Sequence, residues 1–293
     1  MRLAIIGKTG QLGRALLGAA KGNGVAAIAY GRDACDLSEA PSVIESFVAA
    51  LPQNIDCLVI AAAYTNVDGA EDAADLAMTV NAAAPAAIAR ACKKRGLPLV
   101  HISTDYVFDG AATTPYAESA NTAPLNVYGE TKLAGERAII ESGARSIILR
   151  TSWVFDAGGN NFLTAMLRLA KTHDRLSIVD DQWGRPTYAP HLARAVFLAA
   201  KSLCGAGQAD AQIYHVTGGG EMTNWHGFAG YIFKAVENSP QIKPISTKQY
   251  GAKAKRPKFS GLDNSAFGKR FDYVLPHWQS GVDAALSQRK EAL

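Results

Sequence analysis

The first thirteen residues, MRLAIIGKTGQLG (residues 1–13), decide the fold of this chain. An apolar run at 3–6 is followed by three evenly spaced glycines, Gly7, Gly10 and Gly13, and then by a helical pattern. The Lys-Thr pair at 8–9 suggests a triphosphate-binding loop. That loop places its first glycine six residues before the lysine, and here that position is Arg2. The spacing therefore excludes a triphosphate-binding loop.

A strand, a tight glycine turn and a helix amino terminus are instead typical of a dinucleotide-binding loop. The backbone of such a loop approaches a pyrophosphate closely, and a Cβ atom would block that approach. We therefore expect Gly7, Gly10 and Gly13 to hold the pyrophosphate of a dinucleotide. An ordinary turn at a helix entry is the alternative interpretation.

The first 150 residues alternate between short apolar runs and helical patterns. Strands are predicted over 3–6, 25–30, 57–61, 99–103 and 147–150, and helices over 12–20, 43–51, 82–95 and 127–142. Continuous apolar runs are typical of strands buried on both faces. Their alternation with helices predicts an α/β chain with a doubly wound, Rossmann-type parallel sheet. Ligands of such a sheet bind beyond the carboxyl ends of its strands.

After about residue 153 the pattern becomes less regular. Helices are predicted over 162–172, 191–202 and 225–236, strands over 176–179 and 213–216, and a loop rich in Pro and Lys up to about residue 261. We predict a dinucleotide-binding domain over 1–153, to which elements near 176–218 return. Residues 154–293 are expected to form a smaller, partly interleaved α/β lobe that binds the substrate.

Composition narrows the function classes. Hydrophobic residues make up 48% of the 293 residues and charged residues 19%. No run reaches the ~18 apolar residues of a membrane span, and the apolar amino-terminal run is too short for a signal peptide. We predict a cytoplasmic protein that binds neither membrane nor nucleic acid, since the net charge of +4 forms no dense basic stripe. The one dense basic cluster, residues 253–258, is either a solvated surface or a contact with a diphosphate.

Metal chemistry is not predicted. None of the four cysteines forms a C-x-x-C pair, and the six histidines are scattered along the chain. Spacing of this kind supports neither a redox motif nor a zinc site.

The ends of the second and third predicted strands bear on the choice of cofactor. An acidic residue at the second strand end binds the adenosine ribose of NAD, whereas an arginine accommodates the 2′-phosphate of NADP. That strand ends in Arg32 without a preceding acid, which favours NADPH, with NADH possible; a solvated arginine is the alternative. The third strand ends in Ala61, Ala62 and Ala63, whose small side chains let a cofactor lie over the strand end or simply pack closely.

Three polar residues predict acid–base chemistry. Tyr128 and Lys132 are four residues apart in a predicted helix and so share one face, and Thr104 follows the fourth strand. A tyrosine has a pKa of about 10, and we expect the Lys132 cation to lower it so that Tyr128 exchanges a proton near neutral pH. Thr104 is expected to donate a hydrogen bond to a reacting carbonyl oxygen. A helix-surface pair without function is the alternative interpretation of Tyr128 and Lys132.

Seven segments carry a resemblance to a known family. They are GKTGQLG (7–13), AAAYTNVDGAE (61–71), HISTDYVFDG (101–110), PLNVYGETKLAGE (124–136), LRTSWVF (149–155), GNNF (159–162) and DQWGRPT (181–187). They resemble the extended short-chain dehydrogenase/reductase superfamily and, within it, the dTDP-4-dehydrorhamnose reductase family. The resemblance covers nearly the whole chain, through RPKFSGLDNSAF (256–267).

The resemblance implies a reaction and a set of roles. NADPH would reduce the C4 keto group of dTDP-4-dehydro-L-rhamnose to give dTDP-L-rhamnose, and Tyr128 would supply the proton. Thr104, Tyr128 and Lys132 would be catalytic, and Tyr128 and Lys132 would also contact the cofactor. The other implied contacts are Gly7, Gly10, Gln11 and Leu12 at the pyrophosphate, Asp36 and Leu37 at the adenosine, Ala63, Tyr64 and Thr65 at the ribose, and Asp105 and Trp153 at the sugar.

Other activities of the same superfamily stay open at this point. A dehydratase carries an Asp-Glu pair after the threonine, whereas here Asp105 is followed by Tyr106. An epimerase retains NAD tightly, which does not fit Arg32. A reductase that makes the C4 epimer, 6-deoxy-talose, would look much the same. A non-catalytic regulatory subunit would not need the Tyr–Lys pair and the threonine, both of which are present.

The quaternary structure is predicted to be a monomer or a homodimer. Some members of the resembled family are magnesium-linked dimers that use acidic side chains early in the first helix and after the G-x-P-T motif. Here those positions carry Ala15 and Pro190-His191. Since magnesium prefers oxygen ligands, we do not expect that bridge.

Overall fold

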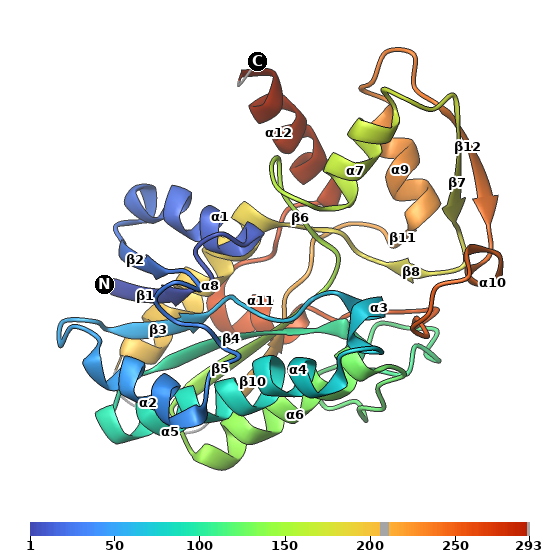
Figure 1. Ribbon diagram of the computed structural model, residues 1–293. Helices are drawn as coiled ribbons and strands as arrows, with labels where there is room; N and C mark the ends of the chain where they lie inside the picture. The colour runs from blue at the N-terminus through green and yellow to red at the C-terminus, as the bar shows by residue number, and fades with distance from the viewer. Residues whose placement is uncertain (206–210, 292–293) are drawn as a thin grey trace.

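Six parallel strands form the central sheet of the computed structural model, which describes residues 1–205 and 211–291 (Figure 1). In sheet order they are β10 (Gln212–His215), β5 (Ser146–Thr151), β4 (Leu99–Thr104), β3 (Cys57–Ile60), β1 (Arg2–Ile6) and β2 (Ala26–Tyr30). The chain moves outward from β1 to β2 and then returns to β3 on the other side of β1, with Leu3 paired to both Ala27 and Cys57. This reversal opens a ligand crevice at the carboxyl ends of β1 and β3. The predicted doubly wound α/β sheet is confirmed.

Both faces of the sheet are covered by helices. Leu3 and Ile5 pack toward α1 (Gln11–Ala20) and α8 (Ala189–Cys204). The alternate residues Ala4 and Ile6 face the other side, where the covering helices are α2 (Pro41–Ala50), α5 (Ala84–Arg95) and α6 (Val127–Ser142). Because successive side chains of a strand point to opposite faces, burial on both sides requires residues 3–6 of β1 all to be apolar.

One predicted helix, over 82–95, begins differently in the structure. α3 (Val67–Ala70) and α4 (Ala74–Met78) come first, and a π-helical turn, η2 (Thr79–Ala83), leads into α5. Pro85 has no N–H to donate to the carbonyl of Asn81, so the normal helical hydrogen bond cannot form there. A widened turn is the local solution, and such turns occur often beside functional sites.

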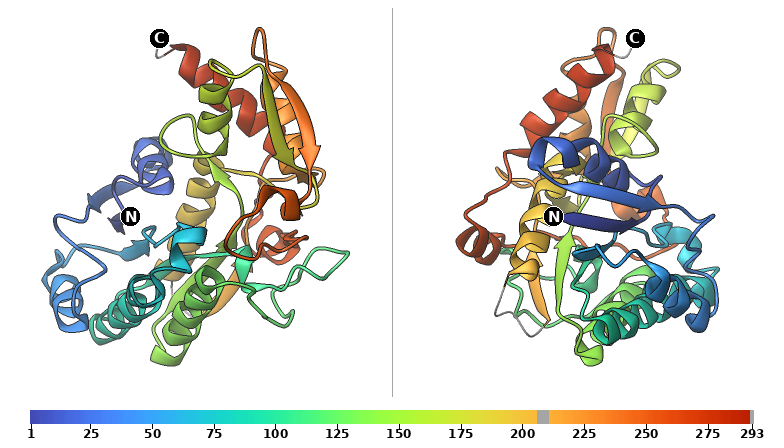
Figure 2. Two further views of the ribbon diagram at one scale, coloured as in Figure 1. Left: turned by 45° about the vertical axis from the view of Figure 1, so that its right-hand side comes forward. Right: turned by 90° about the vertical axis from the view of Figure 1, so that its left-hand side faces the viewer.

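The second lobe stands above the carboxyl edge of the sheet (Figure 2). Its core is aromatic, with Phe155, Phe228 and Trp278 buried together. Around it lie α7 (Phe162–Leu169), α9 (Trp225–Phe233), α12 (Trp278–Glu291), and the two-stranded sheet of β7 (Arg175–Val179) and β12 (Gln241–Ile245). The loop predicted up to residue 261 is therefore wrong over β12. Pro244 is tolerated there because the strand lies at a sheet edge.

Short elements interleave the two lobes. Between residues 176 and 218, β10 is a strand of the central sheet and α8 packs against that sheet, whereas β7 pairs with β12. The remaining elements are β6 (Val154–Phe155) paired with β9 (Thr187–Tyr188), β8 (Trp183–Gly184) paired with β11 (Thr223–Asn224), the turns η1 (Lys21–Asn23) and η3 (Asp105–Val107), and α10 (Thr247–Tyr250) and α11 (Ser265–Phe271). Across the described part of the chain, no helix has the length and apolar character needed to span a bilayer.

Candidate active site

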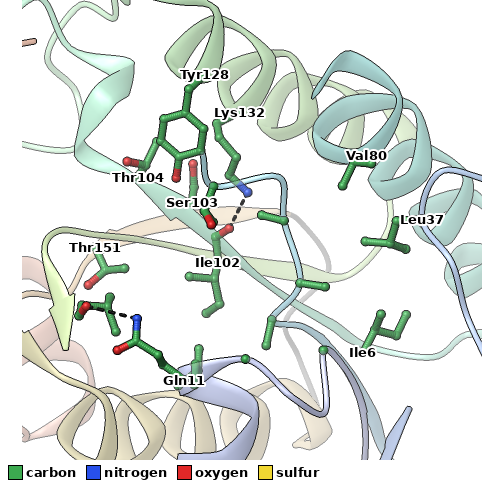
Figure 3. Close-up of a pocket in the computed structure, with 18 of the residues that line it drawn as sticks. Ile6, Gln11, Leu37, Val80, Ile102, Ser103, Thr104, Tyr128, Lys132 and Thr151 are labelled. Carbon is green, nitrogen blue, oxygen red and sulfur yellow. Dashed lines mark hydrogen bonds between the residues drawn. The ribbon is translucent and has the colours of Figure 1, made fainter. Parts of the chain in front are cut away.

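A cavity of about 600 Å³ lies where five parallel strands end. It is lined by residues that directly follow β1, β2, β3, β4 and β5, and by Asn160 and Trp225 of the second lobe. Figure 3 shows Tyr128 and Lys132 entering from α6 on one side and Gln11 from the glycine loop on the other. The crevice therefore brings together segments as far apart in the sequence as Gly7 and Trp225, as expected at the strand ends of an open α/β sheet.

The glycine loop forms one wall of the cavity. Gly7 has φ +114°, and a Cβ on it would lie 2.8 Å from the amide nitrogen of Ala62. A Cβ on Gly13 would overlap the carbonyl oxygen of Gly7. Gly10 caps α1 with extended backbone, and no side chain caps this helix end. The helix therefore presents its positive end to the cavity through a cradle that side chains would fill, which fits a pyrophosphate.

The adenosine end of the cavity is open. The Arg32 side chain is 87% exposed, and its Nε lies 3.8 Å from Oδ2 of Asp36. Asp36 accepts hydrogen bonds from the backbone N–H and hydroxyl of Ser38, which lower the pKa of its carboxyl. Leu37 is buried beneath them. An arginine at this position, exposed and paired at 3.8 Å with one carboxylate, suits a 2′-phosphate.

The acid–base end is buried under α6. Asn126 caps this helix, its side chain accepting a hydrogen bond from Gly129 N–H at 2.8 Å, and Tyr128 lies in the first turn. A Cβ on Gly129 would overlap the carbonyl oxygen of Tyr106, so the glycine lets the helix approach the end of β4. The ring of Tyr106 meets Tyr128 edge-on at 5.6 Å. Thr104, at the tip of β4, accepts from the Tyr106 N–H and donates to Asp105 Oδ1 at 3.0 Å.

The pKa values of Tyr128 and Lys132 correct one expectation from the sequence. Burial raises the pKa of Tyr128 above its usual value, with a hydrogen bond to Thr104 acting against this and Asp105 acting with it. Nζ of Lys132 donates a hydrogen bond to the carbonyl of Ile102 at 2.7 Å and not to the phenol of Tyr128. Burial also lowers the pKa of Lys132 to about 8, against the attraction of Glu136. The predicted lowering of the tyrosine pKa is therefore wrong for this structure, because burial of the phenol dominates and the ammonium of Lys132 is directed to the Ile102 carbonyl.

Another part of the cavity lining, predicted to contact the sugar, combines a carboxyl and two indoles. Burial raises the pKa of Asp105 to about 6, although hydrogen bonds from Ser260 and Thr104 lower it. Trp153 has φ +48°, uncommon for a bulky residue, and its ring stacks on Trp225 at 3.7 Å. Backbone strain of this kind persists where the surroundings impose it, often at ligand sites.

Comparisons with known proteins agree with this geometry. The family described as "RmlD substrate binding domain" matches residues 1–291. The chain belongs to this family. The dTDP-4-dehydrorhamnose reductase of Shigella flexneri is 40% identical over 98% of both chains, and that of Mycobacterium tuberculosis is 36% identical over 98% of this chain and 92% of its own.

Solved structures point the same way. The dTDP-4-dehydrorhamnose reductase of Clostridium acetobutylicum superposes with a TM-score of 0.90 at 32% identity, over 99% of this chain and 100% of its own. That of Bacillus anthracis, in complex with NADP, gives 0.90 at 33% identity, over 98% and 99%. A UDP-glucose 4-epimerase of Thermus thermophilus at 17% identity shares the fold alone.

Most residues predicted for the site line the cavity, as would be expected for a member of this family. Those that do are Gly7, Gly10, Gln11, Leu12, Arg32, Asp36, Leu37, Ala62, Ala63, Thr65, Thr104, Asp105, Tyr128, Lys132 and Trp153. Gly13 is not in the lining, because it packs against Gly7. Tyr64 is also outside the lining; its backbone N–H and C=O are both bonded to the side chain of Asn81 in the π-helical turn.

Several residues that line the cavity were not predicted from the sequence. They are Thr9, Arg14, Cys35, Ser103, Thr151, Ser152, Asn160 and Trp225. Ser103, Thr151 and Ser152 could have been found from their positions at the ends of β4 and β5. Asn160 and Trp225 carried no such signal, since they reach the cavity from the second lobe.

The basic cluster at 253–258 has two parts: Lys253, Lys255 and Lys258 are exposed, whereas Arg256 lies against α3. Arg256 Nη2 is 2.7 Å from Asp68 Oδ2, and its Nη1 donates to the Tyr106 hydroxyl at 3.3 Å. Lys253 pairs with Asp72. Arg256 thus links the carboxyl-terminal part of the chain to Tyr106, a residue of the cavity lining.

Over the described residues, no group of three or more His, Cys, Asp or Glu side chains is placed to hold a metal ion.

Proposed function

We propose that this chain is an NADPH-dependent dTDP-4-dehydrorhamnose reductase in which Thr104, Tyr128 and Lys132 carry the reaction. The activity follows from full-length relatives of that name and from the NADP complex of one of them. One observation supports the roles: the phenol, the ammonium and the hydroxyl line the same cavity as the glycine loop. The reduction converts the C4 keto group of dTDP-4-dehydro-L-rhamnose into the hydroxyl of dTDP-L-rhamnose.

The residues present fit the cofactor. The cradle at Gly7 and Gly10 with the amino terminus of α1 would hold the pyrophosphate, and Arg32 would meet the 2′-phosphate. The small side chains of Ala62 and Ala63 would let the ribose lie across the end of β3. When bound, NADPH supplies the hydride that reduces the C4 carbonyl carbon.

The chain supplies the proton and the orientation. A raised pKa keeps Tyr128 protonated at neutral pH, which is the form that a reduction needs, because the developing alkoxide takes a proton from the phenol. The Thr104 hydroxyl lies beside Tyr128 and would hold the substrate oxygen within reach. Lys132 is mainly a cation below its pKa of about 8, so it would stabilise the tyrosinate left after proton transfer.

A carboxyl and two indoles in the cavity lining would bind the sugar. Asp105 can accept hydrogen bonds from sugar hydroxyls, and the stacked pair of Trp153 and Trp225 offers an apolar face for a pyranose ring. Proteins that bind nucleotide sugars need both kinds of contact, since a sugar ring has a polar rim and less polar faces.

We place the reaction in the cytoplasm, and we propose a monomer or homodimer without a metal bridge.

The test uses purified protein with dTDP-4-dehydro-L-rhamnose and NADPH. The absorbance of the reduced nicotinamide should fall in proportion to enzyme, and NMR of the product should show the C4 configuration of rhamnose. No loss of absorbance would contradict the proposal. A product with the epimeric C4 configuration, 6-deoxy-talose, would keep the reductase chemistry but change the orientation of the sugar.

A further inference from the structure

Five titratable side chains are buried between α6 and the central sheet, behind the active site. They are His101 at 0% exposed, Lys132 at 1%, Glu136 at 1%, Arg150 at 3% and His215 at 0%. Burying such groups is unfavourable unless each finds a partner. The mechanism above uses only Lys132, so the other four need an explanation.

Glu136 forms a buried, two-pronged ion pair with Arg150. Nη2 of Arg150 lies 2.6 Å from Oε2 of Glu136, and its Nε donates to Oε1 at 2.9 Å. On the far side, Nη1 of Arg150 lies 3.4 Å from Nε2 of His215. Glu136 follows Lys132 by four residues on α6, so it shares its face and supplies the negative charge that favours the ammonium.

His101 contacts the ammonium directly. Its Nε2 lies 3.2 Å from Nζ of Lys132, which also donates to the carbonyl of Ile102 at 2.7 Å. An ammonium has only donors, so an imidazole beside it can only accept. Burial and the Lys132 cation both hold the pKa of His101 well below its usual range, which keeps the ring neutral and able to accept.

We propose that His101 is a positioning residue for the reduction: its neutral imidazole, protonated at Nδ1, accepts a hydrogen bond at Nε2 from Lys132. Together with the Ile102 carbonyl it fixes two of the three N–H donors of Lys132 and leaves the third for the cavity. The inference rests on the proposed role of Lys132. The charged group that acts on Lys132 is Glu136 on its own helix. Arg150 on β5 pairs with that carboxylate, and the phenol of Tyr128 lies one turn away on α6.

This arrangement predicts how His101 affects the charge of Lys132. A buried lysine loses its proton readily, and each hydrogen bond that it donates opposes this loss. With His101 in place, Lys132 stays mainly charged at neutral pH. Without an acceptor at that point, the lysine should lose its proton about one to two pH units lower, the effect expected of one charge-assisted hydrogen bond.

The first test measures the tautomer of His101 directly and needs no substrate. The chain has six histidines, so a spectrum of protein labelled with ¹⁵N-histidine can resolve them, and the signal lost in His101→Phe assigns the residue. We expect a protonated Nδ1 and an unprotonated Nε2 across neutral pH. A ring protonated at Nε2, or at both nitrogens, would overturn the inference even if the enzyme is an active reductase.

The second test compares the pH dependence of kcat/KM in two variants. His101→Phe fills the space without an acceptor, and no other hydrogen bond of the ring is lost, because Nδ1 has no partner among the described residues. His101→Gln keeps an acceptor near the position of Nε2. In the Phe variant the alkaline limb should move to lower pH by one to two units, whereas the Gln variant should retain the profile of the natural protein.

Equal profiles in the Phe variant and the natural protein would refute the positioning role. If His101→Phe does not fold, as judged by NADPH titration and thermal melting, His101→Met takes its place in the comparison with the same expected shift. An inactive natural protein would contradict the proposed function instead, and the tautomer measurement would then still decide the hydrogen bond between His101 and Lys132.

Discussion

The two ends of the cavity differ in how deeply their side chains are buried. We expect this difference to determine how strongly a substitution at each end changes the reaction rate. At the end beneath α6, where we propose the reaction takes place, Thr104 is 4% exposed and Lys132 is 1% exposed. At the adenosine end the Arg32 side chain is 87% exposed. Electrostatic interactions weaken steeply when water surrounds the charges. Substitutions at the buried end should therefore change rates by orders of magnitude, and those at the open end by a few-fold.

The largest effect is expected for Tyr128→Phe. The variant keeps the ring and its edge contact with Tyr106 but removes the proton donor. Turnover should fall by about 10²–10⁴, the usual contribution of a general acid, while NADPH binding is retained. Steady-state kinetics with a direct cofactor titration would measure both.

A matched control is Tyr116→Phe. This tyrosine is also buried, and its hydroxyl bonds Asp109 at 2.7 Å outside the cavity. Turnover should change little in this variant. An unchanged rate in Tyr128→Phe would remove the phenol from the mechanism and end the contrast between the two ends of the cavity.

A smaller loss, about 10²–10³ in kcat, is expected for Thr104→Val. The shape of the side chain is kept, but the hydroxyl that would hold the substrate oxygen is lost. Thr104→Ser restores the hydroxyl and should recover most of the rate. If Val and Ser variants lose activity equally, Thr104 acts through packing at the end of β4 and not through its hydroxyl.

Local patterns were enough to predict the elements that bring the glycine loop, Tyr128 and Lys132 to the cavity. The apolar run at 3–6, the glycine spacing and the helix at 127–142 are encoded by neighbouring residues, and the structure contains each of them. Tyr128 and Lys132 share a face simply because they are one helical turn apart. The parallel pairing of a doubly wound sheet then follows from the alternation of strands and helices.

What the sequence could not predict depends on tertiary contacts. Trp225 stacks on Trp153, which lies 72 residues earlier in the chain, so no local sequence pattern could reveal the contact. The sign of the Tyr128 pKa shift depends on how completely the ring is buried, which neighbouring residues do not reveal. β12 contains Pro244, a residue that argues against a strand until its place at a sheet edge is known.

The smallest effect is expected at the open end, for Arg32→Ala. A solvent-exposed ion pair contributes little, and its loss should raise the KM for NADPH by about fivefold at most. The KM for NADH, which has no 2′-phosphate, should stay the same. The ratio of the two values measures the preference, and added salt should reduce it because the charges are screened.

Asp36→Asn is the opposing variant, because it removes the carboxylate that pairs with Arg32 at 3.8 Å. It frees the arginine and removes a negative charge from the same region, so the preference for NADPH should rise where Arg32→Ala lowers it. If both variants weakened NADH and NADPH equally, Arg32 would be a solvated side chain, and the open end would not distinguish the two cofactors. A loss at Arg32 as large as that at Tyr128 would mean that bound NADPH buries this end as deeply as α6 buries the other.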